Sequence, residues 1–277
     1  MKDIYQEITD RITAKLEQGV IPWHKPWIIS GKACAISRST GKPYSLLNQL
    51  ILGKPGEYAT FAQIKQEGGR IKRGAKAQFI VFWKWIEQED KDNPDEVKKI
   101  PFLRYFNVFH LDDCEGLQPK HKTAAAQPLE PDAAASAIIT DYLTRSGVKL
   151  EHQPGDRAFY RPSTDTVVLP QMEQFSELAE YYSTAFHELT HSTGHASRLN
   201  RLTATAHFGN EEYSKEELVA EIGAAALVNH VGLETSSSFR NSAAYVQSWL
   251  KALQNDKRLI VSAAGQAEKA CSLILNN

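Results

Sequence analysis

A proline- and alanine-rich segment divides this chain of 277 residues and limits what it can fold into. Residues 117–132 carry three prolines and a run of three alanines, and they show no hydrophobic periodicity. Because proline fixes its backbone angle and lacks an N–H donor, such a segment is typical of a linker rather than of a helix or strand. We therefore predict two domains, residues 1–117 and 133–277, joined by a linker over 118–132.

The two halves carry opposite formal charges. Residues 1–117 hold 18 Lys and Arg against 15 Asp and Glu, a balance of +3, whereas residues 118–277 hold 14 against 18, a balance of −4. The chain as a whole is close to neutral, which excludes a histone-like polycation but leaves room for a local basic patch. The opposite signs suggest different partners for the two halves.

Cysteine usage and hydropathy favour a cytoplasmic protein. Cys34, Cys114 and Cys271 lie far apart with no CxxC pair, which argues against a disulfide scaffold and against a cysteine-rich zinc finger. The first 19 residues are charged throughout, unlike a secretory signal, and no apolar run reaches the roughly 18 residues that span a bilayer. We expect no membrane partner. A chain of this length can bury a core without a metal, so a bound metal would be catalytic.

Hydrophobic patterning predicts the fold class α+β. In the first half, isoleucine and leucine at four-residue spacing predict a helix from Ile4 to Leu16, ended by Gly19. Runs of β-branched and aromatic residues predict two antiparallel strands there, at 77–86 and 102–111, with a charged loop over 87–99. The second half is expected to be mainly helical with a small sheet. Its helices are expected at about 132–146, 173–195, 215–230 and 241–276, and its strand at 165–169.

The motif His-Glu-Leu-Thr-His at residues 187–191 carries the strongest chemical signal. Histidines at i and i+4 lie one helical turn apart, so both imidazoles project from one face and can bind one metal ion. An apolar stripe on another face of the same segment supports the helix. His187 and His191 suit one Zn²⁺ per chain, with room for a third ligand and a water. Glu188 would then be the general base on the zinc-bound water of a peptidase.

A second predicted helix is expected to supply the third metal ligand. Glu217 and Glu221 stand at i and i+4, and we interpret Glu217 as the ligand and Glu221 as the carboxylate that orients a histidine. One alternative stays open, because Ser214 and Glu217 also form a capping-box pattern, in which case Glu221 would be the ligand. His195 fits better as a helix-terminal residue favoured by the macrodipole. Gly223, with the alanines after it, would let the two helices approach closely.

Two further features suit a peptidase cleft. The strand expected at 165–169 is ended by Pro170, and an edge strand before the histidine helix could align an extended peptide, although a strand that only covers the core fits equally well. Tyr160, His207 and Tyr213 could each donate a hydrogen bond to the oxyanion of the reaction, and no spacing rule favours one of them.

The first half contains a basic strip with aromatic neighbours. Five basic residues and one acid, Glu67, lie between Lys65 and Lys76, and aromatic residues flank them. A cationic groove beside flat aromatic faces is what sequence-tolerant single-strand binding needs, since phosphates attract cations and unstacked bases stack on rings. The alternative is a buried aromatic strand beside a solvated basic face. The candidate contacts from this pattern are Trp23, Trp27, Arg70, Lys72, Arg73, Lys76 and Trp83, with Phe61, Phe79, Phe82 and Trp85 as flanking aromatics.

The motifs together resemble the ArdC antirestriction family of plasmid and mobile-element proteins over the whole chain. In the first half the resemblance rests on IPWHKPW at 21–27, TGKPY at 40–44 with Asn48, GRIKRGAK at 69–76 and VFW at 81–83. In the second half it rests on HELTHSTGH at 187–195 with Arg198-Leu199, EELVAE at 216–221, WLKAL at 249–253 and DKR at 256–258.

This resemblance implies an N-terminal single-stranded-DNA-binding domain, of a kind also attached to plasmid primases. It implies a C-terminal zincin-like metallopeptidase domain similar to DNA-repair proteases of the Spartan type. It adds Lys25 and Asn48 to the candidate DNA contacts. The implied role is to protect incoming DNA from host restriction, in the cytoplasm of the recipient cell during DNA transfer.

The leading hypothesis is an antirestriction protein that binds single-stranded DNA and carries a zinc-dependent peptidase site. Its substrate would be a DNA-bound or restriction-system protein. The alternative is a non-catalytic protein that occludes DNA, with the zinc domain as a structural or docking module. The presence of Glu188 favours the first hypothesis, because a scaffold needs the histidines but not the base. A primase accessory module is disfavoured, because no primase or polymerase motif is recognisable.

Overall fold

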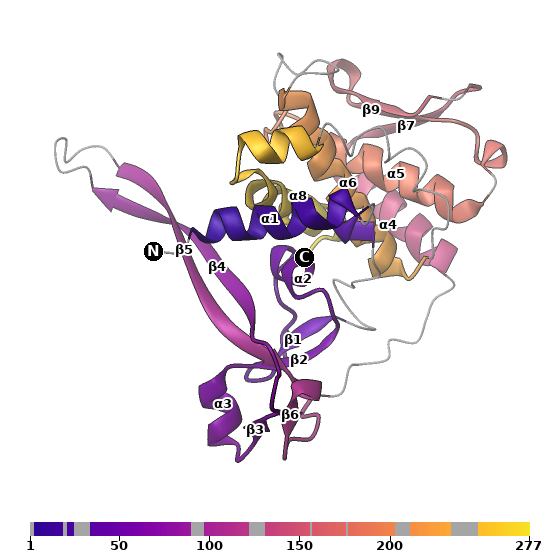
Figure 1. Cartoon of the computed structure of the whole chain (residues 1–277). Helices are drawn as coiled ribbons and strands as arrows, with labels where there is room; N and C mark the ends of the chain where they lie inside the picture. Colours follow the sequence, from indigo (N-terminus) through magenta and orange to yellow (C-terminus); the bar gives the residue numbers. More distant parts are fainter. Residues whose placement is uncertain are drawn as a thin grey trace. The chain divides into compact units, whose positions relative to one another are not determined.

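The computed structural model (Figure 1) divides into two units, each built from helices and a small sheet. The helical unit comprises Met1–Ala33 and Thr123–Asn277, and the ribbon unit comprises Cys34–Lys122. The predicted class, α+β, is confirmed. The structure describes residues 3–18, 21–24, 34–89, 97–121, 131–155, 157–175, 177–202, 211–233 and 249–277.

The N-terminal helix belongs to the helical unit, which the predicted division at residue 117 did not anticipate. Helix α1 (Ile4–Glu17) begins after Asp3, whose carboxylate caps the backbone N–H groups of the first turn. It packs against α8 (Leu259–Leu275), and Thr9 Oγ1 donates a hydrogen bond of 2.9 Å to the carbonyl of Lys257. An apolar stripe shows that a helix covers something, but not which half of the chain it covers.

The described residues of this unit hold four more α-helical segments. They are α4 (Pro131–Ser146), α5 (Leu178–Thr193), α6 (Glu211–Val231) and residues 249–255, which precede α8. The predicted helices at 132–146 and 215–230 are confirmed. Helix α5 begins five residues later than predicted, because a short 3₁₀ turn, Met172–Gln174, comes first. Leu178, the first residue of α5, is exposed. The last predicted helix is interrupted at residues 256–258, and residues 241–248 lie outside the described part of the chain.

A three-stranded sheet lies against α5. Its strands are β7 (Lys149–His152), β8 (Phe159–Arg161) and β9 (Thr166–Leu169), in the order β7-β9-β8. The strand predicted at 165–169 is confirmed, and of its two open interpretations the structure supports the strand that covers the core. Strand β9 pairs with β7 in parallel and with β8 antiparallel, so its backbone is occupied on both sides. The edge strand that contacts α5 is β8.

The ribbon unit is built on a four-stranded sheet of order β1-β2-β5-β4. The predicted antiparallel pair is confirmed as β4 (Gln78–Glu89) and β5 (Val97–His110), but both strands continue into the region predicted as a charged loop. Main-chain pairing needs no apolar side chains, so a polar sequence can extend a hairpin. The other elements are β1 (Ala35–Ser37), α2 (Leu46–Leu52), β2 (Gly56–Ala59), α3 (Phe61–Gln66), β3 (Arg70–Ile71) and β6 (Cys114–Glu115).

The start of the predicted linker is held inside the ribbon unit. Glu57 is buried, pairs with Arg38, and accepts hydrogen bonds from the backbone N–H groups of Lys120 (2.7 Å) and His121 (2.6 Å). The Arg38 guanidinium also donates to the carbonyl of Gln118 (2.9 Å). A buried carboxylate needs such partners, so residues 118–121 are docked rather than extended as a linker.

Candidate metal centre

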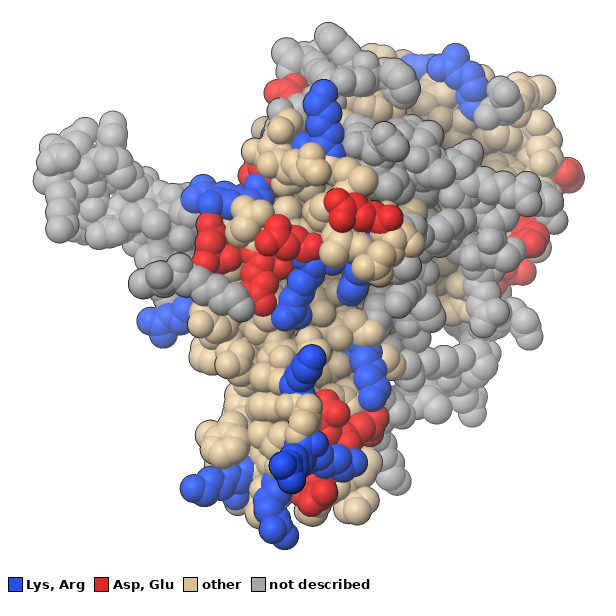
Figure 2. Space-filling model, in the orientation of Figure 1, with Lys and Arg blue, Asp and Glu red and all other residues tan. Residues whose placement is uncertain are grey.

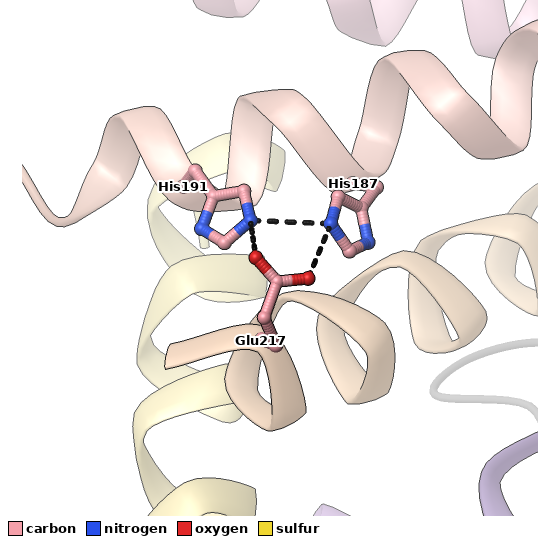
Figure 3. Close-up of side chains that lie close together, drawn as sticks. All are labelled: His187, His191 and Glu217. Carbon is pink, nitrogen blue, oxygen red and sulfur yellow. Dashed lines mark hydrogen bonds and ion pairs between the residues drawn. The ribbon is translucent and has the colours of Figure 1, made fainter. Parts of the chain in front are cut away.

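Helix α5 presents the two motif histidines on one face. Its opposite side is fixed in the core by buried aromatic and aliphatic residues. His187 and His191 therefore stand one turn apart, and their Nε2 atoms lie 3.1 Å from each other (Figure 3). Both imidazoles point toward the neighbouring helix α6 (Figure 3). The structure brings the predicted pair together as the i, i+4 spacing requires.

Helix α6 supplies Glu217 to the same point. This carboxylate is 5% exposed; its Oε1 lies 3.4 Å from His191 Nε2 and its Oε2 lies 3.6 Å from His187 Nε2. The open alternative of a capping box does not hold, because α6 begins at Glu211 and Ser214 lies inside the helix. The Glu217 carboxylate faces the histidines and not a helix N-terminus (Figure 3).

A small residue allows this close approach of α5 and α6. A Cβ placed on Gly223 would lie 2.7 Å from Thr190 Cγ2, well inside van der Waals contact. Thr190 is fully buried, and its hydroxyl donates to the carbonyl of Phe186, so it has little freedom to move away. The glycine was expected to serve this purpose, and the geometry agrees with that expectation.

The three side chains fit a divalent metal ion. Ligands about 2.0–2.1 Å from a tetrahedral ion are separated from one another by roughly 3.3 Å. The two Nε2 atoms lie 3.1 Å apart, Glu217 Oε1 lies 3.4 Å from His191 Nε2, and Glu217 Oε2 lies 3.6 Å from His187 Nε2, so each Glu217 oxygen is close to this spacing from one imidazole. Among the described residues, these three form the group of potential ligands whose donor atoms all lie within 4.8 Å of one another. Two nitrogens and one oxygen leave a fourth position for water or substrate.

The electrostatics of the cluster favour charged side chains. Burial lowers the pKa of His191, but the hydrogen bonds that the imidazole donates to Glu216 and Glu217 outweigh this effect and hold the pKa well above its ordinary value. Burial likewise lowers the pKa of His187, which Glu217 nevertheless raises overall. Burial would raise the pKa of Glu217, yet the two histidines lower it strongly. The site therefore keeps an anionic carboxylate, the form that binds a cation.

Glu216 orients the far nitrogen of His191, a role that sequence reasoning assigned to Glu221. His191 Nδ1 lies 3.2 Å from Glu216 Oε1, whereas Glu221 Oε1 lies 3.9 Å from His187 Nδ1, beyond hydrogen-bond range. Arg201 holds Glu216 through its Nε (3.0 Å) and Nη2 (2.8 Å). The Arg201 guanidinium also donates to the carbonyl of Thr190 in the last turn of α5. The loop after α5 therefore holds the Glu216 carboxylate in place.

Glu188, the predicted base, lies on α5 between the two histidines and is buried. After burial and the glutamate hydrogen bonds, its charge is a further cause of the raised pKa of both His187 and His191. The carboxylate therefore belongs to the electrostatic environment of the site.

Tyr160 and His195 have roles outside the metal cluster. The Tyr160 hydroxyl donates to Asp165 (2.6 Å), and Arg198 ties Asp165 to the carbonyl of Ser192 near the end of α5. The Tyr160 hydroxyl therefore holds β8 in place through Asp165 and is not directed at an oxyanion. His195 lies beyond the helix and contacts Ser197. Tyr213 lies on α6, and His207 lies outside the described residues.

Two predicted DNA contacts are buried. Trp23 is 2% exposed and packs edge-to-face on Trp249 with ring centroids 5.3 Å apart, so no base can stack on it. Asn48 is 5% exposed, and its amide accepts from the N–H of Val81 and donates to its carbonyl, both at 2.8 Å. It therefore fastens α2 to β4. Each corrects a sequence prediction, because a motif cannot distinguish a core residue from a contact residue.

The basic strip is on the surface of the ribbon unit. Figure 2 shows Lys and Arg side chains gathered over the α3, β3 and β6 end of this unit, with acidic side chains among them. All five basic residues of the strip are exposed: Lys65, Arg70, Lys72, Arg73 and Lys76. The remaining candidates are undecided: Lys25 and Trp27 lie outside the described residues, and of Trp83 the structure describes only the backbone in β4.

Two family models match the chain. The N-terminal domain of the anti-restriction factor ArdC matches residues 2–109, and a zincin-like metallopeptidase matches residues 137–266. In the described part of the chain, no helix is both long and apolar enough to cross a bilayer.

Similar proteins include antirestriction factors and primases. Two DNA primases TraC of Escherichia coli are 36% and 34% identical over 99% of this chain, which spans 27% and 20% of their lengths. The uncharacterized protein y4eC of Sinorhizobium fredii is 29% identical over 96% of this chain and 90% of its own length. The crystal structure of the antirestriction protein ArdC from plasmid R388, with Mn(II) bound, is 34% identical with a TM-score of 0.78. That match covers 99% of this chain and 98% of ArdC, and the metal-free ArdC structure matches with a TM-score of 0.75.

Proposed function

The chain belongs to the ArdC antirestriction family, and from this premise we propose that it is an antirestriction protein with a zinc-dependent peptidase site. The observation that carries the peptidase part is the convergence of His187, His191 and Glu217 around one point, beside Glu188. The donor set of two imidazoles and one carboxylate is that of catalytic zinc sites. Since ArdC from R388 binds Mn(II), manganese is the metal to test beside zinc.

A divalent metal bound by these three residues would lower the pKa of a water molecule and polarise a peptide carbonyl. Glu188 is the residue that would take the proton from the attacking water and later deliver it to the leaving amine. Glu217 stays anionic because the histidines lower its pKa, and it therefore contributes charge to the site. Glu216 and Arg201 hold His191 in one orientation.

The edge strand β8 is the element proposed to align the substrate. It contacts α5, and its outer side is opposite its partner β9, so an extended peptide could pair there by adding a strand. Arg198 and Asp165 fix the position of β8 relative to the end of α5. We propose that the substrate is a DNA-bound or restriction-system protein, cut in the cytoplasm of the cell that receives DNA.

We propose single-stranded DNA binding as the second function, carried by the ribbon unit. Its support is the exposed basic strip of Arg70, Lys72, Arg73 and Lys76. It is also supported by the similarity of the whole chain to parts of two DNA primases. Contacts from lysine and arginine to phosphates are independent of sequence, which suits protection of any incoming strand.

Elemental analysis of chelator-free protein tests the metal centre first. Wild type and Glu188→Gln should each retain about one zinc per chain, whereas His187→Ala and Glu217→Ala should lose it while keeping the circular dichroism of the wild type. Glu221→Gln is the matched control on the same helix and should keep the metal. Wild-type protein that is folded and binds neither zinc nor manganese would refute the proposed site.

Hydrolysis of fluorescently labelled casein, with and without single-stranded DNA, tests the chemistry. Wild type should release fluorescent fragments, and Glu188→Gln should release none although it holds metal. Equal cleavage by both would contradict the role of Glu188. Absence of cleavage together with intact protection of DNA by Glu188→Gln would favour the non-catalytic alternative, in which the metal domain serves as a docking module.

A further inference from the structure

Exposed aromatic side chains are concentrated on the β4–β5 hairpin. Phe82 in β4 is 52% exposed, and Tyr105 and Phe106 in β5 are each 48% exposed. In the described part of the chain, Phe61 in α3 is the other aromatic residue with such exposure. Aromatic rings with about half of their surface in water stabilise the fold less than buried rings do. A group of them on one hairpin therefore indicates a binding surface.

The strand register sorts these rings onto two faces. Phe82 lies opposite Arg104, and Ile80 lies opposite Phe106. Opposed residues of an antiparallel pair project from the same face, and so do residues two positions apart along a strand. Phe82, Arg104 and Phe106 therefore share one face, which we call the aromatic face. Tyr105 projects from the other face, because it lies opposite Val81.

The aromatic face lies on the same side of the hairpin as residues that pack into the hydrophobic core. Ile80 and Val108 belong to the same side of the hairpin and pack with Leu52 and Tyr58. The neighbouring strand β2 pairs with β5 at Phe109 and His110, close to the end of β5. From there β4 and β5 extend as a two-stranded ribbon (Figure 1), and on this face Phe82 and Phe106 are about half exposed.

The excess of basic residues in the ribbon unit favours a polyanion as the ligand of this face. The ribbon unit holds 15 Lys and Arg against 11 Asp and Glu, and six of these acids fall within residues 87–96 of the sequence. The rest of the unit, outside residues 87–99, holds 12 basic against 5 acidic residues. Arg104 lies on the aromatic face itself, and Lys76 precedes Phe82 by six residues, at most about 20 Å of chain.

We propose that Phe82 and Phe106 are stacking platforms for the unpaired bases of single-stranded DNA, with Arg104 opposite Phe82 on the same face and the phosphates on the basic strip. This inference rests on the proposed DNA binding of the unit and identifies the residues that contact bases. Every base has a π-face, so rings and a guanidinium plane bind single strands without regard to sequence. Duplex DNA keeps its base faces stacked and cannot use them.

Fluorescence anisotropy with the full chain tests this assignment, using labelled oligo(dT) and an abasic oligomer of equal length and charge. Wild type should bind oligo(dT) more tightly than the abasic strand. Phe82→Leu should weaken oligo(dT) binding about tenfold, and the double variant with Phe106→Leu roughly a hundredfold, with little change for the abasic strand. Leucine keeps the residue apolar but removes the flat ring.

Two control variants separate stacking from charge and from fold. Tyr105→Leu alters an equally exposed ring on the opposite face and should leave both affinities nearly unchanged. Lys72→Gln with Arg73→Gln should weaken both oligomers alike and reduce the salt dependence of log Kd by about 1.4, whereas the phenylalanine variants should keep the salt dependence. All variants should unfold at the wild-type temperature, because the altered side chains are exposed.

Three results would overturn the inference in distinguishable ways. If wild type binds no single-stranded DNA, the proposed function fails with it. If wild type binds but the preference for bases survives Phe82→Leu and Phe106→Leu, or is lost equally in Tyr105→Leu, then the aromatic face is not the stacking site. If sedimentation shows that the wild type is a dimer, and if Phe82→Leu and Phe106→Leu abolish the dimer without a change in DNA affinity, the aromatic face joins two copies of the chain.

Discussion

Replacing Glu216 should weaken metal binding although Glu216 is not itself a ligand. Its Oε1 lies 3.2 Å from His191 Nδ1 and also accepts from Arg201 Nη2 (2.8 Å), and its Oε2 accepts from Arg201 Nε (3.0 Å). In Glu216→Gln one of these oxygens becomes an NH₂ group. At the Oε2 position that group meets one donor, the guanidinium, and at the Oε1 position it meets two, the guanidinium and the imidazole N–H. At least one hydrogen bond is therefore lost, and the chain of contacts that holds the imidazole is weakened.

The expected loss is tenfold to a hundredfold in metal affinity, or about 1.4–2.7 kcal/mol. Competition with a chromophoric chelator measures it directly, with Zn²⁺ and separately with Co²⁺, whose visible spectrum reports whether the coordination is still tetrahedral. Arg201→Lys should give a smaller loss in the same direction, because lysine keeps the charge but not the two-pronged contact. Both variants should stay folded at the temperature of the assay.

Glu221→Gln is the matched comparison, because sequence reasoning gave Glu221 the role that the structure gives Glu216. Its Oε1 is 3.9 Å from His187 Nδ1, so its replacement should change the affinity less than threefold. The reasoning is wrong if Glu221→Gln costs as much affinity as Glu216→Gln, or if Glu216→Gln leaves the affinity within threefold of wild type.

Three other substitutions test the packing of the two units, each read as a change in melting temperature. Gly223→Ala should lower it by several degrees, because the new Cβ meets buried Thr190 at 2.7 Å, whereas Gly265→Ala, in a helix with open space around it, should not lower it. Asn48→Ala should cost about 2–4 kcal/mol, since two buried main-chain groups lose their partner, and an unchanged melting temperature would contradict this. Burial raises the pKa of Asp165, but its guanidinium and phenol partners outweigh this and hold the pKa below the ordinary value of 3.8. The stability that this carboxylate adds is therefore present above that value and is lost as the pH falls through the lowered pKa, so Asp165→Asn should destabilise at pH 7 and progressively less below about pH 4.

The convergence of the three candidate metal ligands was predictable because their signals are local or nearly so. The spacing of His187 and His191 is fixed by one helical turn, whatever the rest of the fold does. Glu217 required a second helix, and its competing role as a cap disappeared only when the structure showed that α6 begins earlier, at Glu211. A capping pattern in a sequence has meaning only if the helix starts there.

Glu216 could not have been singled out from the sequence. Neighbouring residues on a helix project about 100° apart, so only the angle between α5 and α6 places Glu217 on the near nitrogens of the histidines and Glu216 on the far nitrogen of His191. Trp23 was misassigned for a related reason. A tryptophan in a proline-rich loop shows the same pattern whether it stacks on a base or, as here, packs on Trp249.

The predicted domains and the compact units of the structure differ in where they place α1, and this difference can be measured. A fragment of residues 133–277 lacks α1, whose buried face consists of Ile4, Ile8, Ile12 and Leu16, and it lacks Trp23. Each of these side chains contributes about 1.5–3 kcal/mol by burial, so their loss is comparable with the 5–15 kcal/mol that holds a typical domain folded. The fragment should therefore be unfolded or aggregated at 25 °C.

A rejoined chain supplies the control for that fragment. Residues 1–33 connected to residues 123–277 by a Gly/Ser linker of about 20 residues should fold and bind one metal ion, because this chain retains every part of the helical unit. Circular dichroism and metal content compare the two proteins. If residues 133–277 alone fold and hold metal as tightly as the rejoined chain, then α1 and Trp23 are accessory to this unit, and the boundary at the proline-rich segment is the better description of the domains.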